Sequence, residues 1–255
     1  MSTIIACFKW VVDEAYIRRN SSGSLDFSSV DFKISEYDRN AIEEAVRLRD
    51  DHGGTVIAMT VGTPEAAKGV KDALSRGADQ ACFIADEAFS DLEPSLTAAF
   101  MAEVIRGRFA DYSLILCGEG SGDLYAQQVG PALAEYLEIP CVSYVQKVSL
   151  RGEVLVAERR VEEGIEVVEA RLPALVTVCP DVNVPRIPGV RDTLGASKKP
   201  VMTLGRADLV FSGGPFLRTV SLTAAPMDRS CERFPADSTG IRSFVDALQK
   251  KGVIP

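Results

Sequence analysis

Residues 114–137 read LILCGEGSGDLYAQQVGPALAEYL: an apolar run, a glycine-rich turn and then an amphipathic stretch. The run at Leu114–Cys117 predicts a strand, and the apolar spacing of Gln127–Leu137 predicts a helix. The glycines of this stretch are Gly118, Gly120, Gly122 and Gly130. A strand that passes through a short turn into a helix is the repeating unit of a parallel sheet covered by helices.

The same alternation recurs toward the N-terminus. It predicts strands at Ile4–Phe8, Thr55–Val61 and Ala81–Ala85, and helices at Asp38–Arg49, Pro64–Arg76 and Ser95–Phe109. Because such connections leave helices on both faces of the sheet, we expect a three-layer α/β/α fold with an open, mostly parallel sheet.

Beyond residue 140 the pattern changes. Turns separate extended segments at Val142–Leu150, Val154–Arg160 and Ile165–Leu172, which predicts a small antiparallel extension, before a core strand at Leu175–Cys179. From Pro200 the chain shows little periodicity until a last helix at Ile241–Lys250. We therefore expect a main domain over residues 1–200 and an irregular C-terminal arm over 201–255. This arm packs on another chain, wraps the main domain or is loosely attached.

The composition, 46% hydrophobic and 25% charged over 255 residues, is that of a globular protein. No apolar run reaches the roughly 18 residues that a membrane span needs. The first residues lack the basic region of a signal peptide, so we expect a cytoplasmic protein. The net charge of −8 argues against a nucleic-acid partner, since phosphate backbones repel a negative protein.

The cysteines and the histidine limit the metal sites and catalytic groups that the chain can form. The six cysteines form no CxxC pair and several lie in apolar runs, which indicates reduced, mostly buried thiols without a zinc site. His52 is the only histidine and precedes a glycine stop, so we expect a solvated helix end. A Ser-His-Asp triad and a multi-histidine metal site are excluded, and no catalytic acid, base or nucleophile can be assigned.

Ligands of open α/β sheets bind at the carboxyl ends of the strands. Segments 7–10, 61–64 and 118–131 fall at such ends. The last brings glycines, including Gly130, to a helix start, where the backbone can approach a phosphate and unpaired N–H groups face it. It matches neither GxGxxG nor a Walker A loop, and a tight turn without a ligand is an open alternative. At the helix that follows Ile34, Ser35 or Asp38 is an N-cap, or Ser35 and Tyr37 hold a ribose or an adenine.

Three long segments in order carry a resemblance to a known family: KISEYDRNAIEEAVRLRD at 33–50, GEGSGDLYAQQVGPALAEYL at 118–137 and PDVNVPRIPGVRDTLGASKKPV at 180–201. They resemble the small (beta) subunit of electron transfer flavoproteins (ETF), over Ile4 to Val201. The GSGDLYAQQVG form is most similar to the Fix-type branch, which is linked to carnitine and related acyl-CoA reductions.

The resemblance implies an adenine-nucleotide-binding domain that pairs with a larger alpha subunit. It implies an electron carrier, not an enzyme, between a donor such as an acyl-CoA dehydrogenase and an acceptor such as an ETF-quinone-type oxidoreductase. FAD lies at the subunit pair, and the small subunit holds AMP. In electron-bifurcating, NADH-linked members a second FAD takes the place of AMP, and the sequence leaves these two alternatives open.

The resemblance also assigns the site by position. The cofactor-binding residues lie at the strand ends and turns named above: Cys7, Ser35, Glu36, Tyr37, Asp38, Val61, Gly118, Gly120, Ser121, Asp123, Leu124, Tyr125, Ala126, Gln127, Gln128, Val129, Gly130 and Ala134.

A second surface is implied at Ile187–Lys199, the loop that docks on the redox partner. Ile187, Val190 and Leu194 are spaced to share one side of a short helical turn. A basic rim surrounds them: Arg186, Arg191, Lys198 and Lys199. The alternative packs the apolar residues on the chain's own domain. The apolar residues of the arm, Val210, Phe211, Phe216, Leu217 and Phe234, are expected to need a partner surface.

Two other classes share parts of this pattern. A universal-stress-type nucleotide-binding regulator has a similar sheet but lacks an extension such as 180–255. An adenylating enzyme needs a Ser-Gly-Gly-x-Asp-Ser loop after the first strand, where Lys9–Asp13 holds no glycine.

Overall fold

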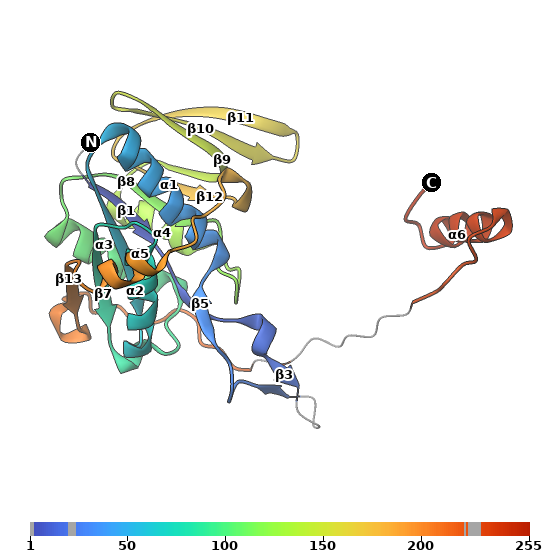
Figure 1. The fold of residues 1–255 in the computed structure, drawn as a ribbon, viewed down its shortest axis with the longest axis horizontal. Helices are drawn as coiled ribbons and strands as arrows, with labels where there is room; N and C mark the ends of the chain where they lie inside the picture. Colours follow the sequence, from blue (N-terminus) through green and yellow to red (C-terminus); the bar gives the residue numbers. More distant parts are fainter. Residues whose placement is uncertain (1–2, 20–23, 222, 224–230) are drawn as a thin grey trace.

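A nine-stranded sheet forms the centre of the protein in the computed structural model, which describes residues 3–19, 24–221, 223 and 231–255 (Figure 1). The strand order is β11-β10-β9-β12-β8-β1-β6-β7-β13. The mutually parallel strands are β1 (Thr3–Cys7), β6 (Thr55–Gly62), β7 (Gln80–Ala85), β8 (Tyr112–Gly118), β9 (Cys141–Arg151), β12 (Ala174–Val178) and β13 (Val201–Leu204). β10 (Val154–Val161) and β11 (Gly164–Arg171) extend this sheet antiparallel, as expected.

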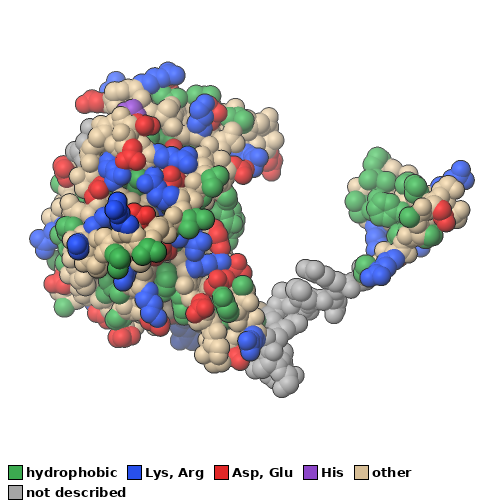
Figure 2. Space-filling model, viewed as in Figure 1, with side chains coloured by type: hydrophobic (Ala, Val, Ile, Leu, Met, Phe, Trp, Pro, Cys, Tyr) green, Lys and Arg blue, Asp and Glu red, His purple; other side chains and the backbone are tan. Residues whose placement is uncertain are grey.

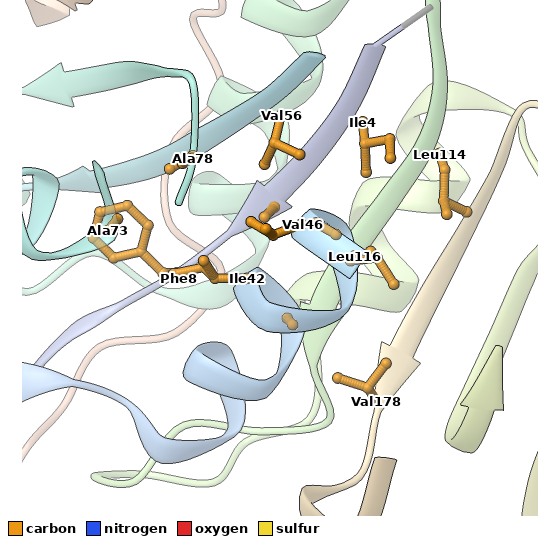
Figure 3. Close-up of a cluster of buried hydrophobic side chains, with 14 of the residues drawn as sticks. Ile4, Phe8, Ile42, Val46, Val56, Ala73, Ala78, Leu114, Leu116 and Val178 are labelled. Atoms are coloured by element: carbon orange, nitrogen blue, oxygen red, sulfur yellow. The ribbon is translucent and has the colours of Figure 1, made fainter. Parts of the chain in front are cut away.

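Helices cover both faces of the sheet, because alternate side chains of each strand point to opposite sides. Ile4 and Ala6 belong to the core under α1 (Glu36–His52), α2 (Ala67–Ser75) and α5 (Val190–Ala196). Ile5 and Cys7 belong to the core under α3 (Pro94–Arg108) and α4 (Val129–Leu137). In Figure 3, Ile42 and Val46 of α1 lie in the same cluster as Leu116 of β8. The predicted three-layer α/β/α fold is confirmed.

The expected strands and helices between residues 4 and 179 are all present, with ends shifted by a few residues. His52 is the exposed last residue of α1, as predicted. The cysteines are free, and all of them are buried except Cys141 and Cys231. Among the described residues, no helix is long and apolar enough to cross a membrane.

The stretch after Pro200 is less irregular than expected. β13 pairs in parallel with β7 at the edge of the sheet. Phe211 packs on Phe100 and Tyr136, with ring centroids 6.0 and 6.3 Å apart, so it is not free for a partner as expected. The division after residue 200 stays a prediction, and the structure places residues 201–211 with the sheet. The sequence signal of β13 is weak because three of its four side chains are exposed.

Two small elements were not expected from the sequence. Between β1 and α1 the chain forms two short antiparallel pairs: β2 (Trp10–Val12) with β5 (Phe32–Ile34), and β3 (Arg18–Arg19) with β4 (Leu25–Asp26). Figure 1 shows this segment extending from the sheet.

The last helix, α6 (Ser238–Lys250), exposes Ile241 and Phe244, and Figure 2 shows the hydrophobic side chains gathered on it.

The start of α4 lies unusually close to the sheet. A Cβ atom added to Gly130 would lie 2.6 Å from Thr177 Cγ2 on β12. The missing side chain of Gly130 therefore allows close packing of helix and sheet. Helix–sheet packing is therefore sufficient to explain a glycine at position 130. The approach of a phosphate, which we expected from the sequence, is not needed to explain it.

We expect Gly130→Ala to destabilise the fold by about 1–3 kcal/mol, because the new methyl group overlaps Thr177. In the Thr177→Ser background the Cγ2 methyl is gone, and the next neighbour, Leu175 Cδ2, is 3.5 Å away. The cost should shrink there, and urea unfolding of the double-mutant cycle measures this. Gly107→Ala, with no atom within 4 Å, is the control and should stabilise α3 by roughly 0.5–1 kcal/mol. Equal effects of the two glycine substitutions in urea would contradict the packing argument.

Candidate functional site

A cleft of about 380 Å³ lies at the carboxyl ends of β1, β6, β7 and β8. Its position is the one that open parallel sheets use for ligands, and its volume lies in the range of small-molecule sites. Most of the expected cofactor residues line it: Cys7, Asp38, Val61, Gly118, Gly120, Ser121, Asp123, Leu124, Ala126, Gln127, Gln128, Val129 and Gly130.

The remaining expected residues are not part of this lining. Ser35 is fully buried, and its Oγ accepts a hydrogen bond from the Gly122 N–H at 3.2 Å. The rings of Tyr37 and Tyr125 pack on each other, 5.2 Å apart. Glu36 pairs with Lys33, and Ala134 is buried in the core under α3 and α4. Ser35 and Tyr37 therefore support the loop that lines the cleft, whereas Ala134 belongs to the core.

One wall of the cleft was missed by the sequence analysis. It comes from the loop after β7 and from α3, and includes Phe89, Leu92, Pro94, Thr97 and Met101. The rule that ligands bind at strand ends applies to β7 as well, so the signal was available from the position alone.

Trp10, from the segment that leaves β1, also lines the cleft. Its indole Nε1 is buried and has no hydrogen-bond partner among the described residues. A buried donor without an acceptor is costly, and a bound molecule that offers an acceptor would relieve this cost.

The carboxylate of Asp38 fixes the floor of the cleft. Its Oδ2 accepts a hydrogen bond from the Lys9 N–H at 2.8 Å, and its Oδ1 accepts one from the Gly118 N–H at 3.0 Å. Burial raises the pKa of Asp38 to about 7, against the opposing effect of these two hydrogen bonds and of the Lys9 charge. Asp38 therefore joins the ends of β1 and β8 to the first turn of α1.

The loop before α4 presents a row of backbone donors. The N–H groups of residues 126–130 find no acceptor among the described residues, and Gln128 provides no side-chain cap for α4. Tyr125 and Gln127 adopt left-handed backbone angles, with φ of 47° and 57°. Because free N–H groups at a helix start attract anions, this row can bind a phosphate or a carboxylate.

The expected docking segment is held against α1 by buried polar groups. Asn40 Nδ2 donates to the carbonyls of Pro180 and Asn183 at 3.0 and 2.8 Å. Arg186 Nε donates to Glu43 at 2.7 Å, so Arg186 is occupied inside the chain.

Beyond this attachment the apolar side chains face outward. Ile187, Val190 and Leu194 are 93%, 80% and 68% exposed, so they do not pack on the chain's own domain. Figure 2 shows hydrophobic side chains at the surface in the region of α5. Lys199 Nζ donates to the carbonyls of Leu74 and Ala78, and Arg186, although exposed, is paired with Glu43. Arg191 and Lys198 are the exposed residues of the expected rim for which the described residues provide no ion-pair partner.

We expect the stability that Asp38 provides to depend on pH. Because its pKa is raised from 3.8 to about 7 on folding, this contribution is complete at low pH and is lost as the pH rises to about 7. Asp38→Asn removes the titration. The difference in free energy of unfolding between wild type and Asp38→Asn should therefore fall over this window, by at most about 1.4 kcal/mol per pH unit. Urea unfolding from pH 4 to 8 measures it, with the exposed Asp51→Asn as control. A constant difference would refute the assignment.

The family comparison agrees with this geometry. The sequence model of the electron transfer flavoprotein domain matches residues 23–209, which is more than half of the chain. The matched region includes the row of donors before α4, most of the cleft lining and the segment that carries α5. It corresponds to neither of the two alternative classes considered above. The chain belongs to the electron transfer flavoprotein family.

Proposed function

We propose that the chain is the small subunit of a heterodimeric electron transfer flavoprotein and that its cleft binds an adenine nucleotide. The observation that carries the proposal is the row of N–H groups at residues 126–130, which have no acceptor in the described part of the chain and lie beside a cleft with apolar walls. The row suits a phosphate, and Phe89, Leu92 and Met101 offer a surface for a base.

The cleft is lined by the carboxyl groups of Asp38, Glu65, Asp91, Glu119 and Asp123, and Lys9 is the one Lys or Arg among its described lining residues. Lys9 Nζ lies 2.6 Å from Asp123, which lines the cleft. Burial acts to raise the pKa of Asp123, but the Lys9 ammonium and the hydrogen bonds to this carboxylate outweigh it and lower the pKa. The ion pair compensates the charge of Asp123, and the proposed phosphate would be held by the backbone donors at the start of α4, not by a free side-chain cation.

In this function the protein binds the nucleotide and orients it. AMP in the cleft anchors the subunit pair, and FAD there would instead accept and donate electrons. The Fix-type form of the loop favours a place in acyl-CoA metabolism with electron bifurcation, which corresponds to FAD in the cleft. No side chain is assigned to proton transfer.

The C-terminal arm of this chain exposes apolar side chains that the larger subunit would cover. Val210, Phe216, Leu217 and Val220 of the arm are each more than two-thirds exposed, as is expected of groups that bury against a partner. These side chains support the expected heterodimer.

The identity of the nucleotide is tested on the complex. We expect the chain to co-purify with a larger flavoprotein subunit and to release AMP, or FAD in addition to that of the partner, when denatured. Ala126→Asp places a carboxylate on the exposed, cleft-lining loop and should weaken AMP binding about tenfold through repulsion. Ala126→Asn has the same shape without the charge and should bind nearly as wild type. A complex that releases no adenine nucleotide and does not bind added AMP or FAD would overturn the proposal.

We also propose that Ile187, Val190 and Leu194 dock on the electron-accepting or electron-donating dehydrogenase. Val190→Glu should slow electron transfer to that protein, because a charge at the centre of an apolar contact must be desolvated. Transfer to a small dye and the melting temperature should not change, since Val190 is 80% exposed. Val167→Glu, at an exposed valine of β11, is the matched control. Equal rates for the two variants, with the physiological partner, would exclude this docking site.

A further inference from the structure

We propose that Glu119 is a positioning residue: its carboxylate holds the loop over residues 119–128 in the shape that presents the N–H row to a nucleotide phosphate. The inference rests on the proposed nucleotide site. It concerns how this site is organised: Glu119 lines the cleft, and it acts through its neighbours because both carboxylate oxygens accept hydrogen bonds from them.

Both oxygens of the Glu119 carboxylate are used. The Tyr125 hydroxyl donates to Oε1 at 2.6 Å, and the Cys179 thiol donates to Oε2 at 3.0 Å. Tyr125 belongs to the loop, whereas Cys179 is buried directly after β12. One carboxylate therefore connects the loop to the sheet.

The loop needs such a connection because its backbone is strained. Tyr125 is not a glycine, yet its φ is 47°, and Gln127 follows with φ of 57°. Left-handed angles at such residues persist only where the surroundings enforce them. The row of unpartnered N–H groups begins at Ala126, between these two residues, so its direction depends on their angles.

The ring of Tyr125 is held as well as its hydroxyl. A Cβ atom at Gly120 would lie 2.5 Å from Tyr125 Cδ2, so the ring packs directly on the backbone of the loop. Tyr37 of α1 packs on the same ring. Gly120 and Tyr37 clamp the ring, and Glu119 fixes its far end.

The two donors stay protonated at neutral pH. The hydrogen bond to Glu119, and then burial, raise the pKa of Tyr125 above its usual value. Burial, and then the Glu119 carboxylate, raise the pKa of Cys179 to about 12. The hydroxyl and the thiol can therefore both donate to Glu119 under ordinary conditions.

The test compares AMP binding by the full chain, co-purified with its larger subunit and freed of nucleotide by dialysis. Glu119→Gln, Tyr125→Phe and Cys179→Ala should each weaken AMP binding about fivefold, since each removes a hydrogen bond that holds the loop. Cys179→Ser keeps a donor and should bind within about twofold of wild type. Tyr125→Phe should weaken AMP binding less in the Glu119→Gln background than in wild type, because the amide of that variant offers a single acceptor oxygen to the two donors.

A second readout separates positioning from direct contact. In the nucleotide-free protein, the hydrogen-bonded amides of Gly122, Leu124 and Tyr125 should exchange faster in Glu119→Gln and Tyr125→Phe, and at an unchanged rate in Cys179→Ser. If Glu119 faced the phosphate, Glu119→Gln would remove a repulsion and bind AMP more tightly, with unchanged exchange.

That result, or wild-type affinity in Glu119→Gln, would overturn the inference and leave the nucleotide function standing. A wild-type complex that binds neither AMP nor FAD would overturn both.

Discussion

The Asp38 carboxylate accepts hydrogen bonds from the backbone N–H groups of Lys9 and Gly118, and so ties two neighbouring strand ends to the first turn of α1. Both strand ends lead into the segments that line the cleft. The two backbone donors offset only part of the cost of burying this group, because its pKa is still raised to about 7. The floor of the cleft is set by this interaction, and the loop before α4 begins from it.

The following residues of α1 hold a second segment of the chain in place. Asn40 and Glu43 hold the chain between Pro180 and Arg186, from which the exposed apolar segment emerges. One helix therefore supports the cleft at its N-terminus and the outward-facing segment a few residues later. Because a helix is stiff over this length, the two surfaces keep a fixed relation to each other without direct contact between them.

Much of the fold could be predicted because the central strands and the helices carry strong periodicity. The strands between Trp10 and Ile34 carry almost none because each has only two or three residues, and β13 carries almost none because three of its four side chains are exposed. For the site, the sequence predicted that it lies at the carboxyl ends of the strands and includes the glycine-rich loop. Which residues line the cleft and which support it depends on side-chain direction. The burial of Ser35 and the bond from Tyr125 to Glu119 follow from tertiary contacts that spacing does not encode.

The order of the strands in the sheet has a consequence for synthesis on the ribosome. β12 lies between β8 and β9, although it is made after β9, β10 and β11. The antiparallel extension can form its own local pairs as soon as residue 171 has emerged, but it has no neighbour in the main sheet until Val178 has followed. During that interval one edge of β9 is an unpaired row of backbone groups, the type of surface that chaperones and other nascent chains bind.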